Sequence, residues 1–159
     1  MTATFPVTVP RSLRTGPDAG AALVEHLTDS SLLDGVDLAV TERTWVRVAT
    51  GGGAEIWLIT WPGGTGTGWH DHGSASGAFA VLSGRLTEYT WTGVATARSL
   101  SRGVVRQFDA SHIHDVVNLG TEPAVSLHAY APSLAAMTRY ELTRGRLQVV
   151  SVEQRGELW

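Results

Sequence analysis

The sequence predicts an all-β fold, a jelly-roll β-barrel with a short helical region at its N-terminus. After Val40, short runs of β-branched and aromatic residues alternate with glycine turns, and no helical pattern separates them. Many short strands at close spacing are typical of an antiparallel sandwich or barrel. Because 159 residues is the usual length of one domain, we expect a single domain over 1–159.

The expected elements follow one another without a linker. Pro17 suits a first helical turn and Gly35 a stop, so we predict a helix from Pro17 to Leu33, within a helical part of about 17–34. The β-barrel then occupies about 40–155. Its expected strands are 44–50, 54–61, 77–84, 85–93, 94–100, 103–108, 114–120, 124–132 and 146–154.

Composition excludes several classes of protein and site. A net charge of −3 offers no basic surface, so we expect no nucleic-acid partner and no membrane partner. The chain has no cysteine, and any metal must be held by imidazole, carboxylate or water. Its start lacks an export signal, and no apolar run is long enough to span a membrane. We therefore expect a cytoplasmic protein, and nothing in the sequence requires more than a monomer.

Histidines provide the strongest functional signal. Five of the six lie in three strand-like segments: His70 and His72, His112 and His114, and His128. If the first segment is extended, His70 and His72 point to the same face and Asp71 to the other. Such a pair is either half of a metal site or two ordinary surface histidines.

The spacing around both pairs resembles the two motifs of the cupin superfamily. Gly64, five residues and then His70-x-His72 match the first motif, and Gly103 through Asn118 keeps the spacing of the second. Two departures stand out: Asp109-Ala110-Ser111 replaces P-x-G, and Ser76 or Gly77 occupies the position of the usual glutamate ligand. The resemblance favours His114 as the third ligand, with His112 as a pocket or rim residue.

A three-histidine set without a carboxylate resembles the thiol dioxygenases, most of all the cysteine dioxygenases. The stretches 69–88 and 113–134 look like the two signatures of that family. Ser126, His128 and Tyr130 are similar to its outer-sphere relay. The resemblance implies Fe(II) held by His70, His72 and His114, catalytic roles for that relay, and oxidation of L-cysteine by O2 to cysteine sulfinic acid.

Elementary charge considerations agree with that reaction. Three neutral imidazoles leave Fe(II) its full charge, which favours an anionic ligand such as a thiolate. The substrate carboxylate needs a counter-charge, and we expect Arg47, in an aromatic-x-arginine stretch, to bind it. Arg43 is the competing candidate. Some animal members carry a cysteine at the position of Gly77 that cross-links to the tyrosine, so here Tyr130 stays unmodified.

Other functions remain compatible with the same residues. The substrate could be another small thiol, such as 3-mercaptopropionate. The chain could also be a cupin that binds metal without redox turnover, or a zinc- or manganese-dependent isomerase or decarboxylase. The intact Ser126, His128 and Tyr130 set favours the dioxygenase, because a binding module does not need it.

Overall fold

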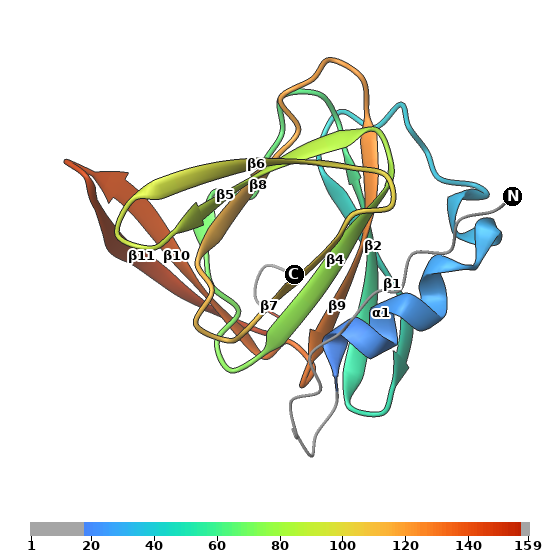
Figure 1. The fold of residues 1–159 in the computed structure, drawn as a ribbon, viewed down its shortest axis with the longest axis horizontal. Coiled ribbons are helices and arrows are strands. Elements are labelled where there is room, and N and C mark those ends of the chain that lie inside the picture. The colour runs from blue at the N-terminus through green and yellow to red at the C-terminus, as the bar shows by residue number, and fades with distance from the viewer. Residues whose placement is uncertain (1–17, 157–159) are drawn as a thin grey trace, which may run out of the picture.

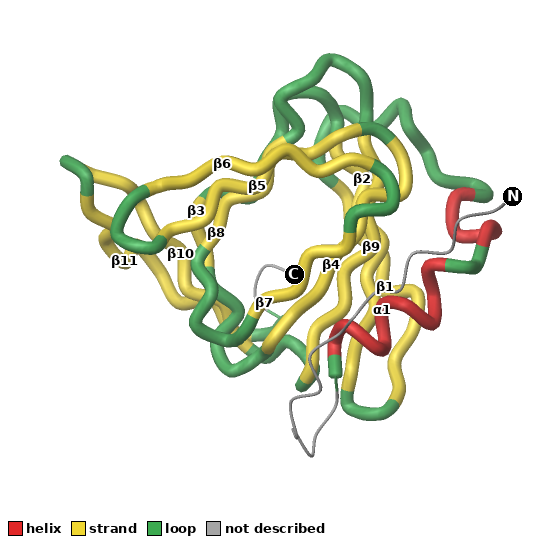
Figure 2. Tube along the Cα trace, viewed as in Figure 1, coloured by secondary structure: helices red, strands yellow, loops and turns green. Residues whose placement is uncertain are grey.

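The structure, a computed structural model, describes residues 18–156 and is a barrel built from two antiparallel sheets (Figure 1, Figure 2). The strand order is β1-β2-β9-β4-β7 in the five-stranded sheet and β11-β10-β3-β8-β5-β6 in the six-stranded sheet. The predicted all-β fold with a helical N-terminal part is confirmed. Among the described residues, no helix has the length and apolar character needed to cross a membrane.

Each predicted strand is present in one of the two sheets. The five-stranded sheet contains β1 (Thr44–Gly51), β2 (Ala54–Trp61), β9 (Ala124–Ala131), β4 (Ser76–Ser83) and β7 (Val105–Phe108). The six-stranded sheet contains β11 (Arg146–Gln154), β10 (Ala136–Thr143), β3 (Trp69–His70), β8 (His114–Val117), β5 (Arg85–Trp91) and β6 (Ala95–Ser101). The prediction missed β10, because its polar residues form no apolar run.

The N-terminal helix is shorter than predicted. Asp18 caps α1 (Ala19–Leu27), since its side chain accepts a hydrogen bond from the backbone N–H of Gly20 at 2.8 Å. A separate 3-10 turn, η1 (Ser30–Leu33), follows, and the side chain of Asp29 caps it. The prediction of one continuous helix is therefore wrong, because a second capping residue starts a new turn. Pro17 lies outside the described residues.

Strand β9 has one face toward the interior of the barrel and the other toward α1. All eight of its residues are buried, and successive side chains point to opposite faces. Leu127 and Ala129 belong to the apolar cluster that packs under α1, together with Leu23 of the helix. The opposite face presents Ser126, His128 and Tyr130 to the interior of the barrel. The barrel therefore encloses the polar residues of β9, and α1 buries the apolar residues on its other face.

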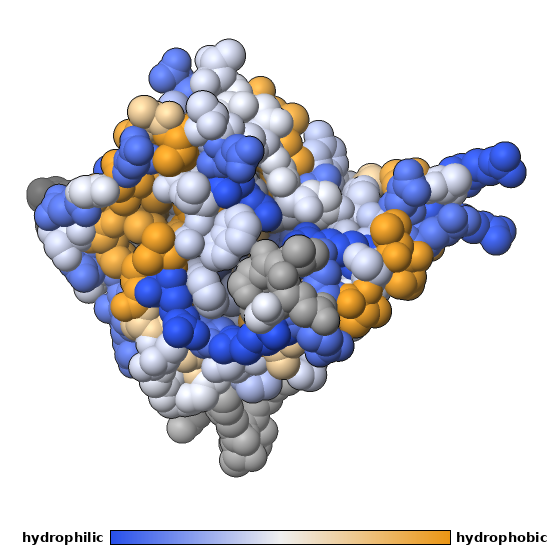
Figure 3. All heavy atoms as spheres, turned by 180° about the vertical axis from the view of Figure 1, so that it is seen from behind, coloured by the Kyte–Doolittle hydropathy of each residue, from blue (hydrophilic) through white to orange (hydrophobic). Residues whose placement is uncertain are grey.

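The β10–β11 hairpin extends from the barrel and carries much of the exposed apolar surface. Leu142, Val149, Val150 and Val152 are all exposed on it. Viewed from behind, apolar side chains are visible along this projection, and hydrophilic side chains mark its tip (Figure 3). At its other end, β10 pairs with β3 through Arg139 and His70, which ties the hairpin to the functional site.

Candidate metal centre and substrate pocket

Three histidines converge inside the barrel. His70 ends β3 and His114 begins β8, and these two residues are paired across the strands. His72 reaches the same place from the turn after β3, so only the first part of the predicted extended segment is a strand. One ring nitrogen of each lies within 4.8 Å of the others, close enough to serve one metal ion. We call these residues the histidine cluster.

Hydrogen bonds hold the Nδ1 atoms of His70 and His114 and leave their Nε2 atoms free to bind a metal. His70 Nδ1 donates to the backbone oxygen of Gly68, and His114 Nδ1 donates to Glu88 Oε1, both at 2.9 Å. In the neutral rings, the lone pair is then on Nε2. Both ring nitrogens of His72 are buried without a hydrogen-bond partner among the described residues. An orphaned buried imidazole between two oriented ones fits a metal site.

Burial also keeps the cluster neutral. Desolvation lowers the pKa of His70 and His72 well below the ordinary value, and neighbouring histidines lower it further. Burial lowers the pKa of His114 as well, although its bond to Glu88 opposes that shift. Neutral imidazole is the form that binds a metal. The donor set therefore suits a divalent transition metal, and no carboxylate belongs to it.

Glu88 is a functional residue that the sequence analysis missed. Its carboxylate is almost fully buried and accepts bonds from His114, His112 and Arg106 Nε, the last at 2.5 Å. Burial raises the pKa of Glu88, but these bonds outweigh burial and hold it below the ordinary value. The available signal was its position on β5, where it shares the inward face with Leu86.

His112 lies beside the histidine cluster without joining it. Its Nε2 lies 2.9 Å from the same Glu88 oxygen that holds His114. Its ring stacks on Phe108, with the centroids 4.9 Å apart. Glu88, His112 and His114 are also near enough to hold an ion, but one oxygen of Glu88 already bonds His112 Nε2 and His114 Nδ1. The expectation that His112 is a pocket or rim residue stays a prediction.

Ser126, His128 and Tyr130 form a connected row on the inner face of β9. Ser126 Oγ lies 2.8 Å from His128 Nε2, and the Tyr130 hydroxyl lies 3.5 Å from His128 Nδ1. Trp61, which the sequence analysis did not place here, donates to Ser126 Oγ at 2.8 Å. With its oxygen accepting from Trp61, the Ser126 hydroxyl can donate to Nε2, which leaves the proton of His128 on Nδ1, facing Tyr130.

The protonation of this row follows from its burial. Burial lowers the pKa of His128 to about 3, so the imidazole is neutral near pH 7. Burial raises the pKa of Tyr130 to about 12, although Arg43 and Arg139 oppose the shift. The tyrosine is therefore a protonated phenol. Because His128 Nδ1 faces the phenol oxygen, the Tyr130 proton is free to point into the neighbouring cavity.

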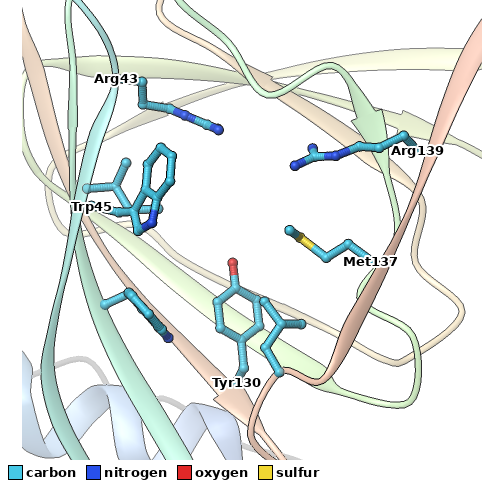
Figure 4. Close-up of a pocket in the computed structure, with 8 residues that line it drawn as sticks. Arg43, Trp45, Tyr130, Met137 and Arg139 are labelled. Carbon is cyan, nitrogen blue, oxygen red and sulfur yellow. The ribbon is translucent and has the colours of Figure 1, made fainter. Parts of the chain in front are cut away.

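That cavity, the substrate pocket, opens at the mouth of the barrel. The Tyr130 hydroxyl points into it from below, and Arg43 and Arg139 point into it from facing walls (Figure 4). Aromatic and aliphatic side chains form most of the remaining wall. The pocket is lined by Arg43, Trp45, Trp57, Ile59, Tyr130, Leu134, Met137 and Arg139.

Arg47, the expected carboxylate-binding residue, lies elsewhere. Its side chain is 48% exposed and pairs with Glu55 at 3.4 Å. It lines a different cavity, to which Trp57 and Arg155 also contribute. Arg43, the competing candidate, occupies the substrate pocket, where its guanidinium lies over the rings of Trp45 and Trp61. Arg43 therefore lines the same cavity as Tyr130, and Arg47 does not.

Gly77 is paired with Tyr130 across β4 and β9. A Cβ atom at Gly77 would lie 2.2 Å from the ring of Phe108. Phe108 in turn packs on the rings of His72 and His114, with centroids 4.8 and 5.0 Å away. An aromatic side chain therefore fills the space that a side chain at Gly77 would need, and it buttresses the histidine cluster.

Comparison with known proteins agrees with this site. The family profile described as cysteine dioxygenase type I matches residues 34–143. Cysteine dioxygenase type 1 of Homo sapiens is 26% identical over 108 residues, which cover 61% of this chain and 54% of that protein. The same protein of Pongo abelii matches equally well. The chain thus spans about half the length of the curated relatives it matches.

Solved structures support the fold. An RmlC-like cupin protein from Desulfovibrio desulfuricans superposes with a TM-score of 0.55 at 20% identity, covering 64% of this chain and 92% of that one. A cupin superfamily protein from Desulfitobacterium hafniense gives a TM-score of 0.52 at 12% identity, covering 60% and 83%. These likenesses concern the cupin fold alone, whereas the family profile covers most of the chain. The chain belongs to the cysteine dioxygenase type I family of the cupin superfamily.

Proposed function

We propose that the protein is an Fe(II)-dependent thiol dioxygenase that converts L-cysteine and O2 to cysteine sulfinic acid, a reaction of cysteine catabolism. The observation that carries this proposal is His72, a buried imidazole with two unpartnered nitrogens, between His70 and His114. Membership of the family supports thiol oxidation as the reaction at this metal site.

The histidine cluster would hold the metal through the nitrogens that face its centre. When bound, iron supplies the redox centre through which both oxygen atoms of O2 are added to a thiol sulfur. Since His70, His72 and His114 are neutral, they leave the charge of the metal uncancelled. The site therefore favours a substrate that arrives as an anionic thiolate over a neutral alcohol or amine.

The substrate pocket would orient the rest of the substrate. Arg43 offers a guanidinium fork that suits a carboxylate. Tyr130 keeps its proton at neutral pH and can donate a hydrogen bond to an oxygen atom of the substrate or product. Leu134 and Met137 are buried in the pocket wall and limit the access of water. His128, held by Ser126, keeps the tyrosine hydroxyl in place.

Oxygen consumption tests the proposal directly. Protein stripped with a chelator and reloaded with Fe(II) is given L-cysteine, 3-mercaptopropionate or cysteamine, and the product is identified by mass. We expect uptake with L-cysteine, a product heavier by two oxygen atoms, and little uptake with cysteamine, because it lacks the carboxylate that Arg43 binds.

Other outcomes separate the alternatives. Oxygen uptake with 3-mercaptopropionate alone would support a thiol dioxygenase but would replace L-cysteine as its proposed substrate. A protein that retains iron but consumes no oxygen with any thiol would overturn the proposal in favour of a cupin without redox turnover. His114→Ala is the matched negative control, because it removes one of the three ligands and leaves the substrate pocket intact.

A further inference from the structure

The β10–β11 hairpin ends the six-stranded sheet, and its outer strand has an open edge. Within residues 18–156, β11 pairs with β10 and with no other strand. The nine residues Arg146–Gln154 therefore present backbone N–H and C=O groups along the side that faces away from β10. The hairpin also extends away from the barrel (Figure 1). An edge of this kind can accept a further strand.

Apolar side chains make this edge unfavourable to leave in water. Val149, Val150 and Val152 are 64%, 63% and 56% exposed. The middle of the strand, from Leu147 to Val152, contains no charged residue and no proline, both of which commonly prevent edge-to-edge pairing. Leu142 of β10 adds a fourth exposed apolar side chain to the hairpin. Contiguous apolar surface on a folded chain is typical of a contact with another molecule.

The sequence of β11 is self-complementary, which points to a second copy of this chain as the occupant. In an antiparallel pair about a two-fold axis between Val149 and Val150, each residue meets one of matching character. The opposed pairs are Arg146 with Glu153, Leu147 with Val152, Gln148 with Ser151, and Val149 with Val150. Opposite charges meet, an amide meets a hydroxyl, and the apolar residues meet one another.

The faces of the strand agree with this register. Arg146 and Glu153 pair with Thr143 and Met137 of β10, which are an even number of residues apart, so both charged side chains lie on one face. A slip of one residue would oppose residues from different faces. A slip of two residues would place Arg146 opposite Arg155, which follows the strand and carries the same charge.

The other edge strands lack this complementarity. Strand β1 also exposes apolar residues, Trp45, Val46 and Val48, but its one charged residue is Arg47 and it has no acid. Pairing of β1 with its own copy would bring two Arg47 side chains together. Strand β7 has only four residues, and the exposed residues of β6 are small, polar or basic.

We infer that β11 is the interface of a homodimer, in which two copies pair antiparallel and join their six-stranded sheets into one. The exposed valines supply most of the stabilisation, since Glu153 is only 12% exposed and already bonds Arg139. The charges of Arg146 and Glu153 instead set the register. One strand pair is a small interface, so we expect a reversible dimer with a Kd in the micromolar range.

Sedimentation velocity of the full chain over a range of concentrations tests the interface. We expect the wild type to dimerise as its concentration rises. Val150→Lys sets an ammonium group against Val149 of the other copy and should raise the dimer Kd by about 10-fold or more. Val94→Lys is the matched control, because Val94 is 64% exposed in the turn between β5 and β6, at the opposite edge of the sheet. Its Kd should stay within about twofold of the wild type, since an exposed charge changes little.

Engineered cysteines test the register, because the chain has none of its own. Leu147→Cys and Val152→Cys proteins are mixed and oxidised, and the linked species is measured by mass. In the proposed register these two positions face each other across the copies, within the span of a disulfide. Each position lies about 16 Å from its own counterpart, which is too far for a disulfide. The mixture should therefore cross-link, and either variant alone should cross-link several-fold less.

Each outcome supports or overturns the interface. A wild type that stays monomeric at every concentration would overturn it, as would equal effects of Val150→Lys and Val94→Lys. A dimer that is broken by Val46→Lys on β1 and unaffected by Val150→Lys would overturn it in favour of the other edge. Cross-linking of the single variants as readily as of the mixture would overturn the register. None of these measurements uses turnover, so their failure leaves the proposed function untouched.

Discussion

The histidine cluster and the neighbouring pocket are built in different ways. The histidine cluster lies deep in the barrel, and residues close in sequence or directly paired across strands bring it together. The two arginines of the pocket, Arg43 and Arg139, lie at its mouth: Arg43 precedes β1 of one sheet, and Arg139 lies on β10 of the other. The histidines of the cluster are brought together by neighbouring residues and one strand pair. The position of the two arginines depends on how the two sheets close.

The difference between them concerns charge as well as connectivity. Burial keeps the histidines of the cluster neutral, and the orienting carboxylate, Glu88, is itself paired three times. At the mouth, Arg139 pairs with Glu153, and the Arg43 guanidinium lies over the rings of Trp45 and Trp61. We therefore expect changes in the histidine cluster to affect metal retention and changes at the mouth to affect substrate choice.

The largest effect should follow removal of a ligand in the histidine cluster. His114→Ala should weaken iron binding by more than about 100-fold. Removing a residue that only hydrogen-bonds a metal ligand already lowers metal affinity by about 10–100-fold. His112→Ala, the matched control from the same segment, should retain most of the iron. Competition with a chromogenic chelator measures both. Loss of iron from the His112 variant with retention in the His114 variant would reverse the assignment.

Loss of the phenol should reduce turnover without releasing the metal. Tyr130→Phe should lower kcat/KM by about 10–100-fold, the equivalent of one charge-assisted hydrogen bond. Tyr140→Phe is the control, because its hydroxyl donates to Asp71 outside the pocket. Steady-state oxygen uptake at known iron content measures the effect. Nearly normal turnover in Tyr130→Phe would remove the tyrosine from the mechanism.

Glu88 should influence iron affinity through its hydrogen bond to His114. Glu88→Gln weakens the acceptor for His114 Nδ1, so the Kd for iron should rise by about 10-fold. Glu55→Gln is the control, since Glu55 is an equally buried carboxylate that bonds arginines outside the cluster. If both variants bind iron as the wild type does, Glu88 has only a packing role.

A side chain added at Gly77 should lower stability and displace Phe108, which packs against the histidine cluster. A methyl group there meets the Phe108 ring, so Gly77→Ala should lower the free energy of unfolding by about 1–3 kcal/mol. In a Phe108→Leu background the same change should cost less. Gly51→Ala, where no atom lies within 4 Å of the added Cβ, should be close to neutral. Urea unfolding of all variants checks this coupling, and equal costs in both backgrounds would contradict it.

The smallest effect concerns pH. The pKa of His128 is about 3 in the folded chain and about 6.5 in the unfolded chain, so below pH 6.5 the unfolded state binds more protons. Stability of the metal-free protein should therefore fall as the pH is lowered from 6.5, by about 1 kcal/mol per pH unit for each such histidine. In His128→Gln the fall in stability per pH unit should be smaller by the contribution of this one histidine. Urea unfolding between pH 5 and 7.5 measures it, and an identical slope would refute the assignment.

Much of the fold was predictable because local patterns agree with the tertiary structure. Apolar runs separated by glycine turns predicted nine of the strands correctly. The missed strand β10 has no such run, since it is half-buried and its Arg139 and Tyr140 are used at the site and in packing. Its pairing partners, β3 and β11, hold it in the sheet, and no local pattern reports such pairing.

The site divides in the same way. The spacing of His70, His72 and His114 pointed to the cluster because the family motifs keep that spacing. The argument that i and i+2 residues share a face of a strand does not place His72, which lies in the turn after β3. Arg43 and Arg47 could not be separated from the sequence, since both lie in the same short stretch, on either side of Trp45. They lie four residues apart, about 13 Å along an extended chain, and only one reaches the mouth.

The sequence by itself therefore determined the all-β barrel, the histidines that gather in it and the row of Ser126, His128 and Tyr130, since each follows from short-range periodicity or motif spacing. The tertiary structure alone decided that Glu88 orients His114, that Arg139 faces Arg43, and that Phe108 fills the space beside Gly77. These contacts join residues whose proximity depends on closure of two sheets around one cavity, and no local pattern encodes that distance.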